Sequence, residues 1–181
     1  DAIVRLEPST DRVQVGDVVT YRVLLDPESN AVWGVDLWLT YDRQHLSLDD
    51  TRTTEVLPEL LPGNALSGAP GILRYVAASA TTPITETTWV LELTFRAKRS
   101  TPGPAPLVAF SDEPAHRQVV SAGGENVLQA TENALLAVRG EDDLFVPLII
   151  RDPTSPRDPA YPSPSDERPS TIGRQAVSRP R

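Results

Sequence analysis

The sequence predicts an all-β protein, an antiparallel, nine-stranded β-sandwich with jelly-roll topology. Short segments in which apolar and polar residues alternate recur along the chain at spacings of about 10 to 15 residues, and clusters of proline and glycine divide them. No segment has the apolar spacing of an amphipathic helix of three turns. The 181 residues can bury a core without disulfides, and the chain contains no cysteine.

The candidate strands follow one another in order along the chain. The segments from which we expect roughly nine strands are residues 2–7, 19–25, 33–42, 46–48, 72–78, 87–98, 107–110, 118–121, 127–130 and 134–138. Turn residues separate them, most clearly at 8–11, 26–30, 101–106 and 123–126. The segment 51–71 is different, because Pro58 and Pro62 limit any helix in it to about one turn. We expect an irregular loop there, with one short helical piece.

The stretch 33–42 is the clearest strand. Because side chains alternate across a strand, one face carries only apolar side chains, those of Trp33, Val35, Leu37, Leu39 and Tyr41. The opposite face is polar apart from one large aromatic, and carries Gly34, Asp36, Trp38, Thr40 and Asp42. This mixture is typical of a surface strand that holds a partner. The alternative is an ordinary half-buried strand whose Trp38 is covered by a loop.

The charge of the chain is acidic and unevenly spread. Of the net charge of −8, residues 1–151 carry −9 and residues 152–181 carry +1. An acidic body without a basic stripe repels phosphate backbones, which argues against nucleic-acid binding. No run approaches the roughly 18 apolar residues that a membrane span needs. The chain opens directly in a strand without a signal peptide, so we interpret it as a mature product or an excised fragment.

Several segments together resemble a cohesin domain. They are Val15-Gly16-Asp17 before an alternating strand, the stretch 34–42 with Leu46 just beyond it, the strand 91–98, and the closing segments 119–120, 124–127 and 133–138. The resemblance covers about residues 2–140. It implies a nine-stranded jelly roll without catalytic residues, displayed outside a bacterial or archaeal cell.

The resemblance also implies a partner. Cohesins hold dockerin modules of polysaccharide-degrading enzymes through one sheet face. On the matching strand Asp36 stands where the family carries an acidic residue that hydrogen-bonds the partner, and Trp38 and Thr40 project from the same face. Gly34 departs from the family, since well-studied members often carry a polar amide there, and this leaves the class of dockerin open. We expect a monomeric module that acts in polysaccharide degradation or cell-surface assembly.

The composition of this sheet face favours protein binding on physical grounds, independently of the family resemblance. An aromatic anchor supplies apolar contact and neighbouring carboxylates or hydroxyls fix the register of the partner. Residues on other strands extend the surface if those strands neighbour the central one. The candidate partner-binding residues are Asp36, Trp38, Thr40, Arg74, Glu92 and Thr94.

Two alternatives remain open. A carbohydrate-binding module would present several aromatic rings in a plane for sugars to stack on. Alternation instead turns Trp33, Trp89, Tyr21 and Tyr41 inward, which leaves Trp38 as the single outward ring. The second alternative is a structural or adhesive sandwich with no specific ligand.

Catalysis and cofactors are not expected. Neither His45 nor His116 has a serine elbow nearby, and adjacent Asp49 and Asp50 point apart on a strand, unlike a glycosidase pair. Calcium is the one metal with candidate ligands, in the acidic loops 112–113 and 141–143. Both lack the spacing of a calcium-binding loop, so we expect solvated loops.

The character of the chain changes after Gly140. We expect a cohesin-like domain over residues 1–140, followed by a short apolar closing segment at 141–151. Residues 152–181 contain seven prolines and almost nothing to bury, which predicts a disordered linker or tail.

Overall fold

A computed structural model describes residues 1–66 and 71–140 of the chain. All of these residues belong to one compact unit, Asp1–Leu144. The expected closing segment 141–151 and the tail 152–181 lie outside the described residues.

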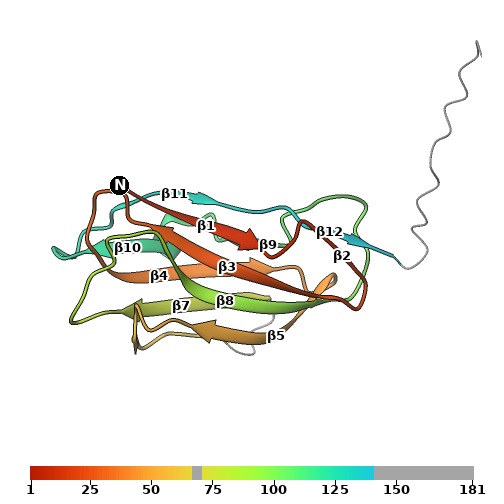
Figure 1. The fold of residues 1–181 in the computed structure, drawn as a ribbon, viewed down its shortest axis with the longest axis horizontal. Helices are drawn as coiled ribbons and strands as arrows, with labels where there is room; N and C mark the ends of the chain where they lie inside the picture. The colour runs from red at the N-terminus through yellow and green to blue at the C-terminus, as the bar shows by residue number, and fades with distance from the viewer. Residues whose placement is uncertain (67–70, 141–181) are drawn as a thin grey trace, which may run out of the picture. The chain divides into compact units, whose positions relative to one another are not determined.

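The described residues form two main sheets, which Figure 1 shows packed on each other. The first, here the β4 sheet, has the order β10-β4-β7-β6, and β9 also pairs with β4. Its strands are β4 (Val32–Tyr41), β6 (Glu59–Leu60), β7 (Ile72–Ala78), β9 (Val108–Phe110) and β10 (Arg117–Ser121). The second, here the β8 sheet, has the order β11-β1-β3-β8-β5. Its strands are β1 (Ala2–Pro8), β3 (Val18–Asp26), β5 (Leu46–Thr53), β8 (Thr88–Ala97) and β11 (Leu128–Glu132).

The chain crosses repeatedly between the sheets, which makes the fold a sandwich. It passes from β3 to β4, back to β5, over to β6 and β7, and back to β8. A small parallel pair, β2 (Arg12–Gln14) with β12 (Ala137–Arg139), stands beside the main sheets. The predicted all-β sandwich is therefore confirmed.

Two details of the prediction need correction. The described residues hold twelve strands rather than nine, and four of the twelve have only two or three residues. The sandwich is also not wholly antiparallel, since β1 pairs with β11 and β2 with β12 in parallel. Such pairings join strands far apart in sequence, and alternation within a strand carries no signal of them.

The core lies between the two sheets and is built from the alternating apolar faces. Tyr21 and Phe95 meet there edge to face, with ring centroids 5.9 Å apart, and Tyr41 packs on Phe95 at 5.2 Å. On β4 the buried residues are Val35, Leu37 and Leu39, as alternation predicts.

β-Bulges change the expected burial of two tryptophans. Between β3 and β8 the register shifts beside Trp89, so that Val90 is fully buried and Trp89 lies under the outward guanidinium of Arg22, 5.6 Å from its ring. A second shift between β10 and β4 buries Val32 and leaves Trp33 half-buried. A bulge adds one residue to one strand and so changes the face of its neighbour.

The segment 51–71 also differs from its prediction. Its start extends β5 to Thr53, and Glu59–Leu60 forms the edge strand β6 beside β7. No helix forms in its described part. The helical turn that the described residues do contain is η1 (Pro114–His116), a 3-10 turn directly before β10 that alternation did not indicate.

Candidate functional site

The outer face of β4 carries the central candidate residues. β4 lies between β10 and β7, so the outward side chains of Asp36, Trp38 and Thr40 have neighbours on both sides. Trp38 pairs in register with Arg74 of β7, and Asp36 lies diagonally from that arginine. The structure therefore brings together four of the six predicted residues.

Asp36 and Arg74 form a two-pronged ion pair on this face. Nε of Arg74 donates to Oδ1 of Asp36 at 3.0 Å, and Nη2 donates to Oδ2 at 2.5 Å. The side chains are 20% and 29% exposed. The hydrogen bonds to Asp36 raise the pKa of Arg74 against the opposing effect of desolvation. The carboxylate and the guanidinium thus hold each other in a fixed orientation.

Trp38 is stacked between two neighbours. His116 lies parallel to the indole, with ring centroids 4.4 Å apart and an interplanar angle of 18°. The guanidinium of Arg74 lies 5.1 Å from the indole centroid. Because His116 leads into β10 and Arg74 belongs to β7, the two groups reach Trp38 from opposite sides of β4. We refer to His116, Trp38, Arg74 and Asp36 as the Trp38 tier.

The histidine of this tier was missed by the sequence analysis, which gave it no role in binding. η1 turns His116 onto Trp38, and its ring nitrogens lie 3.1 Å from Oγ of Ser111 and 3.6 Å from Oε2 of Glu113. A three-residue turn has no period that could have indicated this contact.

Exposed aliphatic side chains flank the tier. Ile72 is 44% exposed at the start of β7, and Leu61 is 38% exposed beside the other end of β7, where its N–H donates to the carbonyl of Val76. Ile72 shares the outward face of Arg74 by alternation, so this signal was present in the sequence. Thr40 is exposed next to Ile72, and its hydroxyl lies 3.5 Å from the carbonyl oxygen of Ala109.

Glu92 and Thr94 do not belong to this surface, which corrects the prediction for both. They lie on β8, in the other sheet of the sandwich. Glu92 is 7% exposed and accepts from Arg22 at 2.9 Å and from Arg52 at 3.4 Å. They were included on the condition that their strand lies next to β4. Alternation within a strand does not indicate the order of the strands in a sheet.

The outer face of the β8 sheet is a surface of paired charges. Besides the Glu92 cluster it carries an ion pair between Arg5 and Asp26 at 3.2 Å and one between Arg96 and Asp49 at 2.8 Å. These pairs join neighbouring strands. Exposed Val18 also lies in this sheet, opposite Arg96, but no two aromatic rings stack beside an ion pair on its described part as they do at Trp38.

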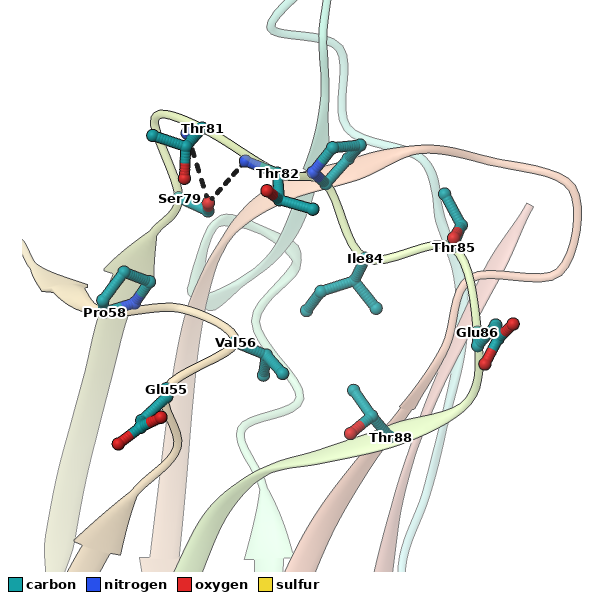
Figure 2. Close-up of a pocket in the computed structure, with 11 residues that line it drawn as sticks. Glu55, Val56, Pro58, Ser79, Thr81, Thr82, Ile84, Thr85, Glu86 and Thr88 are labelled. Atoms are coloured by element: carbon teal, nitrogen blue, oxygen red, sulfur yellow. Dashed lines mark hydrogen bonds between the residues drawn. The ribbon is translucent and has the colours of Figure 1, made fainter.

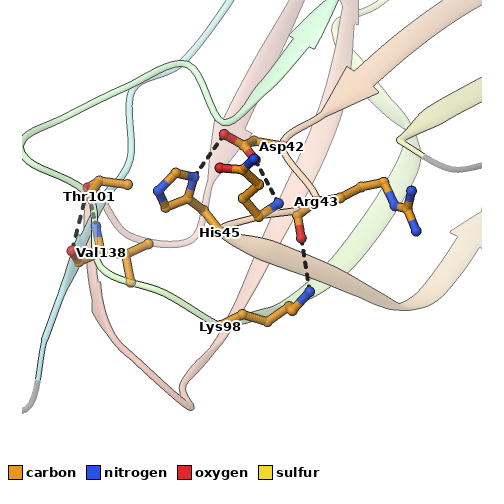
Figure 3. A network of polar contacts seen from close by, with 7 residues as sticks. Asp42, Arg43, His45, Lys98, Thr101 and Val138 are labelled. Atoms are coloured by element: carbon orange, nitrogen blue, oxygen red, sulfur yellow. Dashed lines mark hydrogen bonds and ion pairs between the residues drawn. The ribbon is translucent and has the colours of Figure 1, made fainter.

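The other histidine stabilises a turn. Nδ1 of His45 lies 2.8 Å from Oδ2 of Asp42, and the N–H of Gln44 donates to Oδ1 of Asp42 at 2.7 Å (Figure 3). The His45 side chain is 18% exposed, so most of it is shielded from solvent within the turn. Nearby, Nζ of Lys98 donates to the carbonyl of Arg43 at 2.9 Å.

A pocket of about 380 Å³ lies where the segment before β6 meets the β7–β8 connection (Figure 2). Ile84 and Val56 point into it, and the side chain of Ser79 binds the N–H groups of Thr81 and Thr82 at its rim. Its lining is dominated by threonine and contains no aromatic ring and no cationic side chain. The pocket therefore has no aromatic surface on which a sugar could stack and no cationic group that could pair with an anion.

Metal ligands do not gather in the described part of the chain. Within residues 1–66 and 71–140 no three His, Cys, Asp or Glu side chains come close enough to hold a metal ion. The acidic loop 112–113 is in this part, whereas 141–143 lies outside the described residues. No helix within the described ranges is long and apolar enough to cross a membrane.

Comparison with solved structures finds the same fold in several cohesins. CaCohA2 from Clostridium acetobutylicum has a TM-score of 0.60 at 20% identity, covering 75% of this chain and 90% of that one. A non-cellulosomal cohesin from the archaeon Archaeoglobus fulgidus has a TM-score of 0.60 at 12% identity, covering 78% and 93%. The sixth cohesin of Acetivibrio cellulolyticus scaffoldin B, solved in complex with a mutant Cel5 dockerin, has a TM-score of 0.59 at 17% identity, covering 76% and 99%.

Sequence comparison gives the family. No curated protein matches this chain at a significant level. Residues 4–128 match the family model described as Cohesin domain, which is more than half of the chain. The resemblance seen in the sequence is thereby confirmed, and this protein belongs to the cohesin family.

Proposed function

We propose that this chain is a non-catalytic, dockerin-binding module whose contact surface is the outer face of the β4 sheet. The observation that carries the proposal is the Trp38 tier, with exposed Ile72 and Leu61 beside it. An aromatic and an arginine surrounded by aliphatic side chains are the composition of an interface centre. Solved members of the family include a cohesin in complex with a dockerin.

The rigidity of the tier favours protein binding. Trp38 and Arg74 are held by stacking and by the ion pair with Asp36, so little side-chain freedom is lost when a partner docks. On the β8 sheet, in contrast, outward charges such as Glu92 already have partners on neighbouring strands.

Polysaccharide binding is less well supported. A sugar ring stacks on the face of an aromatic ring, and the two faces of Trp38 are occupied by His116 and Arg74. The Trp89 ring that the bulge turns outward lies under Arg22 and on the other sheet. Trp38 therefore offers no open face and Trp89 has one face covered, although an acidic sugar could still pair with Arg74.

The proposed setting is outside the cell. The module would act there as a monomer that gathers dockerin-bearing proteins, in polysaccharide degradation or in cell-surface assembly. The family supports this setting. Detection of the protein in the culture supernatant or on intact cells, with a cytosolic marker absent, is the measurement that checks it.

The test of the proposed function is binding of the full chain to a panel of recombinant dockerins, beside depletion assays on insoluble cellulose, xylan and chitin. Trp38→Ala should weaken dockerin binding by about 2 kcal/mol, roughly 30-fold, because it removes the centre of the contact. Asp36→Ala should weaken it as well, since it releases Arg74.

Arg52→Ala is the matched control. Arg52 is 67% exposed on the β8 sheet, so its removal should leave dockerin binding unchanged. If both tier variants bind dockerin like the wild type, the assigned face is wrong. If no dockerin binds and an insoluble polysaccharide retains the protein, the proposed function is wrong.

A further inference from the structure

Arg74 keeps part of its hydrogen-bonding capacity free. A guanidinium has five N–H donors, one on Nε and two on each Nη. Asp36 accepts from Nε and from one N–H of Nη2. No residue in the described part of the chain accepts a hydrogen bond from Nη1. Three N–H donors of Arg74 therefore have no acceptor among residues 1–66 and 71–140.

The free donors have a defined geometry. A guanidinium can bind a carboxylate by its side edge, through Nε and one Nη, or by its end edge, through the two Nη atoms. Asp36 occupies the side edge. The end edge, with one N–H of Nη1 and the second N–H of Nη2, is left for a second planar acceptor.

Three neighbours fix the direction of this edge. Asp36 holds one side of the guanidinium and Trp38 lies against its plane. Gly63 leaves room for the group, since a Cβ atom there would lie 2.6 Å from Nη1 of Arg74. The positive φ of 94° at Gly63 also favours glycine. Arg74 thus presents its end edge without having to give up rotamer freedom on binding.

The apolar surroundings define what else the partner carries. Ile72 lies two residues before Arg74 on β7, and Leu61 lies beside Val76, two residues after it. Four strand residues span about 13 Å. Exposed aliphatic side chains therefore stand on both sides of the free edge, along the line of β7.

We propose that the end edge of Arg74 binds a side-chain carboxylate of the protein partner, an Asp or Glu that the partner presents between two aliphatic side chains. The inference rests on the proposed function for the identity of the partner as a protein. It makes Arg74 the residue that selects among dockerins, while Asp36, each of whose oxygen atoms accepts one hydrogen bond from Arg74, holds the guanidinium in place.

The first experiment tests the carboxylate site without a dockerin. The ¹⁵N-labelled full chain is titrated with sodium acetate against sodium chloride of equal ionic strength, and the Nε–Hε signals of its arginines are followed by NMR. The signal of Arg74 should respond to acetate with a dissociation constant about threefold or more below that of the exposed Arg139. Equal responses of the two arginines would overturn the inference.

The second experiment uses any dockerin that the wild type captures. Arg74→Lys keeps the charge but loses the planar fork, and should weaken binding about tenfold or more. Replacing the contacting Asp or Glu of the dockerin with Asn or Gln should weaken its binding to the wild type by a similar factor. The same replacement should not weaken its binding to the Arg74→Lys variant any further. Arg52→Lys, on the β8 sheet, is the control that should bind normally.

The outcomes separate the two proposals. Tight binding by Arg74→Lys, or equal losses from the dockerin substitution in both backgrounds, overturns the carboxylate inference and leaves the proposed function intact. Failure to capture a dockerin, with acetate still selective for Arg74, overturns the proposed function and leaves the carboxylate edge established. Retention on polygalacturonate with no dockerin captured would assign that edge to an acidic sugar and overturn the protein partner.

Discussion

Beneath the Trp38 tier, the hydroxyl of Tyr75 lies buried without a hydrogen-bond partner in the described structure. Tyr75 is fully buried on the inward face of β7, next to Arg74 on the outward face. Desolvation raises the pKa of its phenol well above the usual range. A buried hydroxyl without a partner loses its hydrogen bonds to water on folding.

Removing that hydroxyl should therefore stabilise the protein. We predict that Tyr75→Phe raises the free energy of unfolding by about 1 kcal/mol, because the ring keeps its packing while the desolvated group disappears. Urea unfolding at neutral pH measures it. Tyr41→Phe, at a half-buried position on β4, should change stability by less than about 0.5 kcal/mol. A loss of stability in Tyr75→Phe would mean that the hydroxyl has a partner, such as a buried water.

At the scale of elements, the close approach of β4 to β7 explains a glycine. A Cβ on Gly34 would lie 3.1 Å from the carbonyl oxygen of Ala77 and 3.5 Å from Cβ of Ala78. These strands pair directly, with Gly34 opposite Ala78. Glycine at this position thus coincides with a narrow gap between two strands.

This gap predicts the effect of a small substitution. Gly34→Ala should lower the free energy of unfolding by about 1 kcal/mol, because the neighbouring strand has to move to admit the methyl group. Gly103→Ala is the control, since nothing lies within 4 Å of its added Cβ. It should leave stability unchanged or raise it by about 0.5 kcal/mol. Thermal or urea unfolding of the two variants decides between a packing effect and a general effect of alanine.

The turn between β4 and β5 carries the chain from one sheet to the other, and Asp42 organises it. Burial acts to raise the pKa of Asp42, but the hydrogen bonds from His45 and from the backbone of Gln44 outweigh it and leave the pKa lowered. A carboxyl with a lower pKa in the folded state than in the unfolded state stabilises the fold when it is ionised. That stabilisation is present above the unfolded pKa of about 4 and is lost as the pH falls through the folded pKa.

Asp42→Asn should remove this pH dependence. We expect the variant to be less stable than the wild type at pH 7 and to lose less stability than the wild type between about pH 5 and pH 2. Unfolding free energies at a series of pH values measure the difference. Parallel pH curves for the two proteins would show that Asp42 does not stabilise the turn through its charge.

At the scale of the whole molecule, the two sheets present different outer faces. The β8 sheet carries cross-strand ion pairs such as Arg5–Asp26 and Arg96–Asp49. The β4 sheet carries the Trp38 tier with exposed Ile72 and Leu61. Surface ion pairs contribute little to stability but keep an exposed sheet from associating, whereas an aromatic and aliphatic patch does the opposite. Under the proposed function, this asymmetry would direct the partner to the β4 sheet.

The described body should also stand alone. We predict that a chain of residues 1–140 unfolds in one cooperative transition, with a midpoint within about 2 °C of the full chain, because both sheets and the core between them lie inside these residues. Calorimetry of the two chains checks this. A much lower midpoint for the shorter chain would move the domain boundary beyond Gly140.

The sequence by itself determined the fold class and the outward triplet on β4. Alternation is a local property with a period of two residues, so it could assign Asp36, Trp38 and Thr40 to one face and Leu37 and Leu39 to the core. The strand 72–78 and the family were likewise readable from the chain. Each inference about a strand needs only residues that are near one another in sequence, and the family follows from the order of such local segments along the chain.

Tertiary structure decided which strands are neighbours, and with it the composition of the site. It placed Arg74 beside Trp38, and it placed Glu92 in the opposite sheet. Both residues had been equal candidates for the binding surface in the sequence. It also introduced the bulge that turns Trp89 outward and the short turn that lays His116 on Trp38. Strand order, register shifts and turn contacts depend on packing between segments far apart in the chain, for which a periodic pattern in a single segment carries no signal.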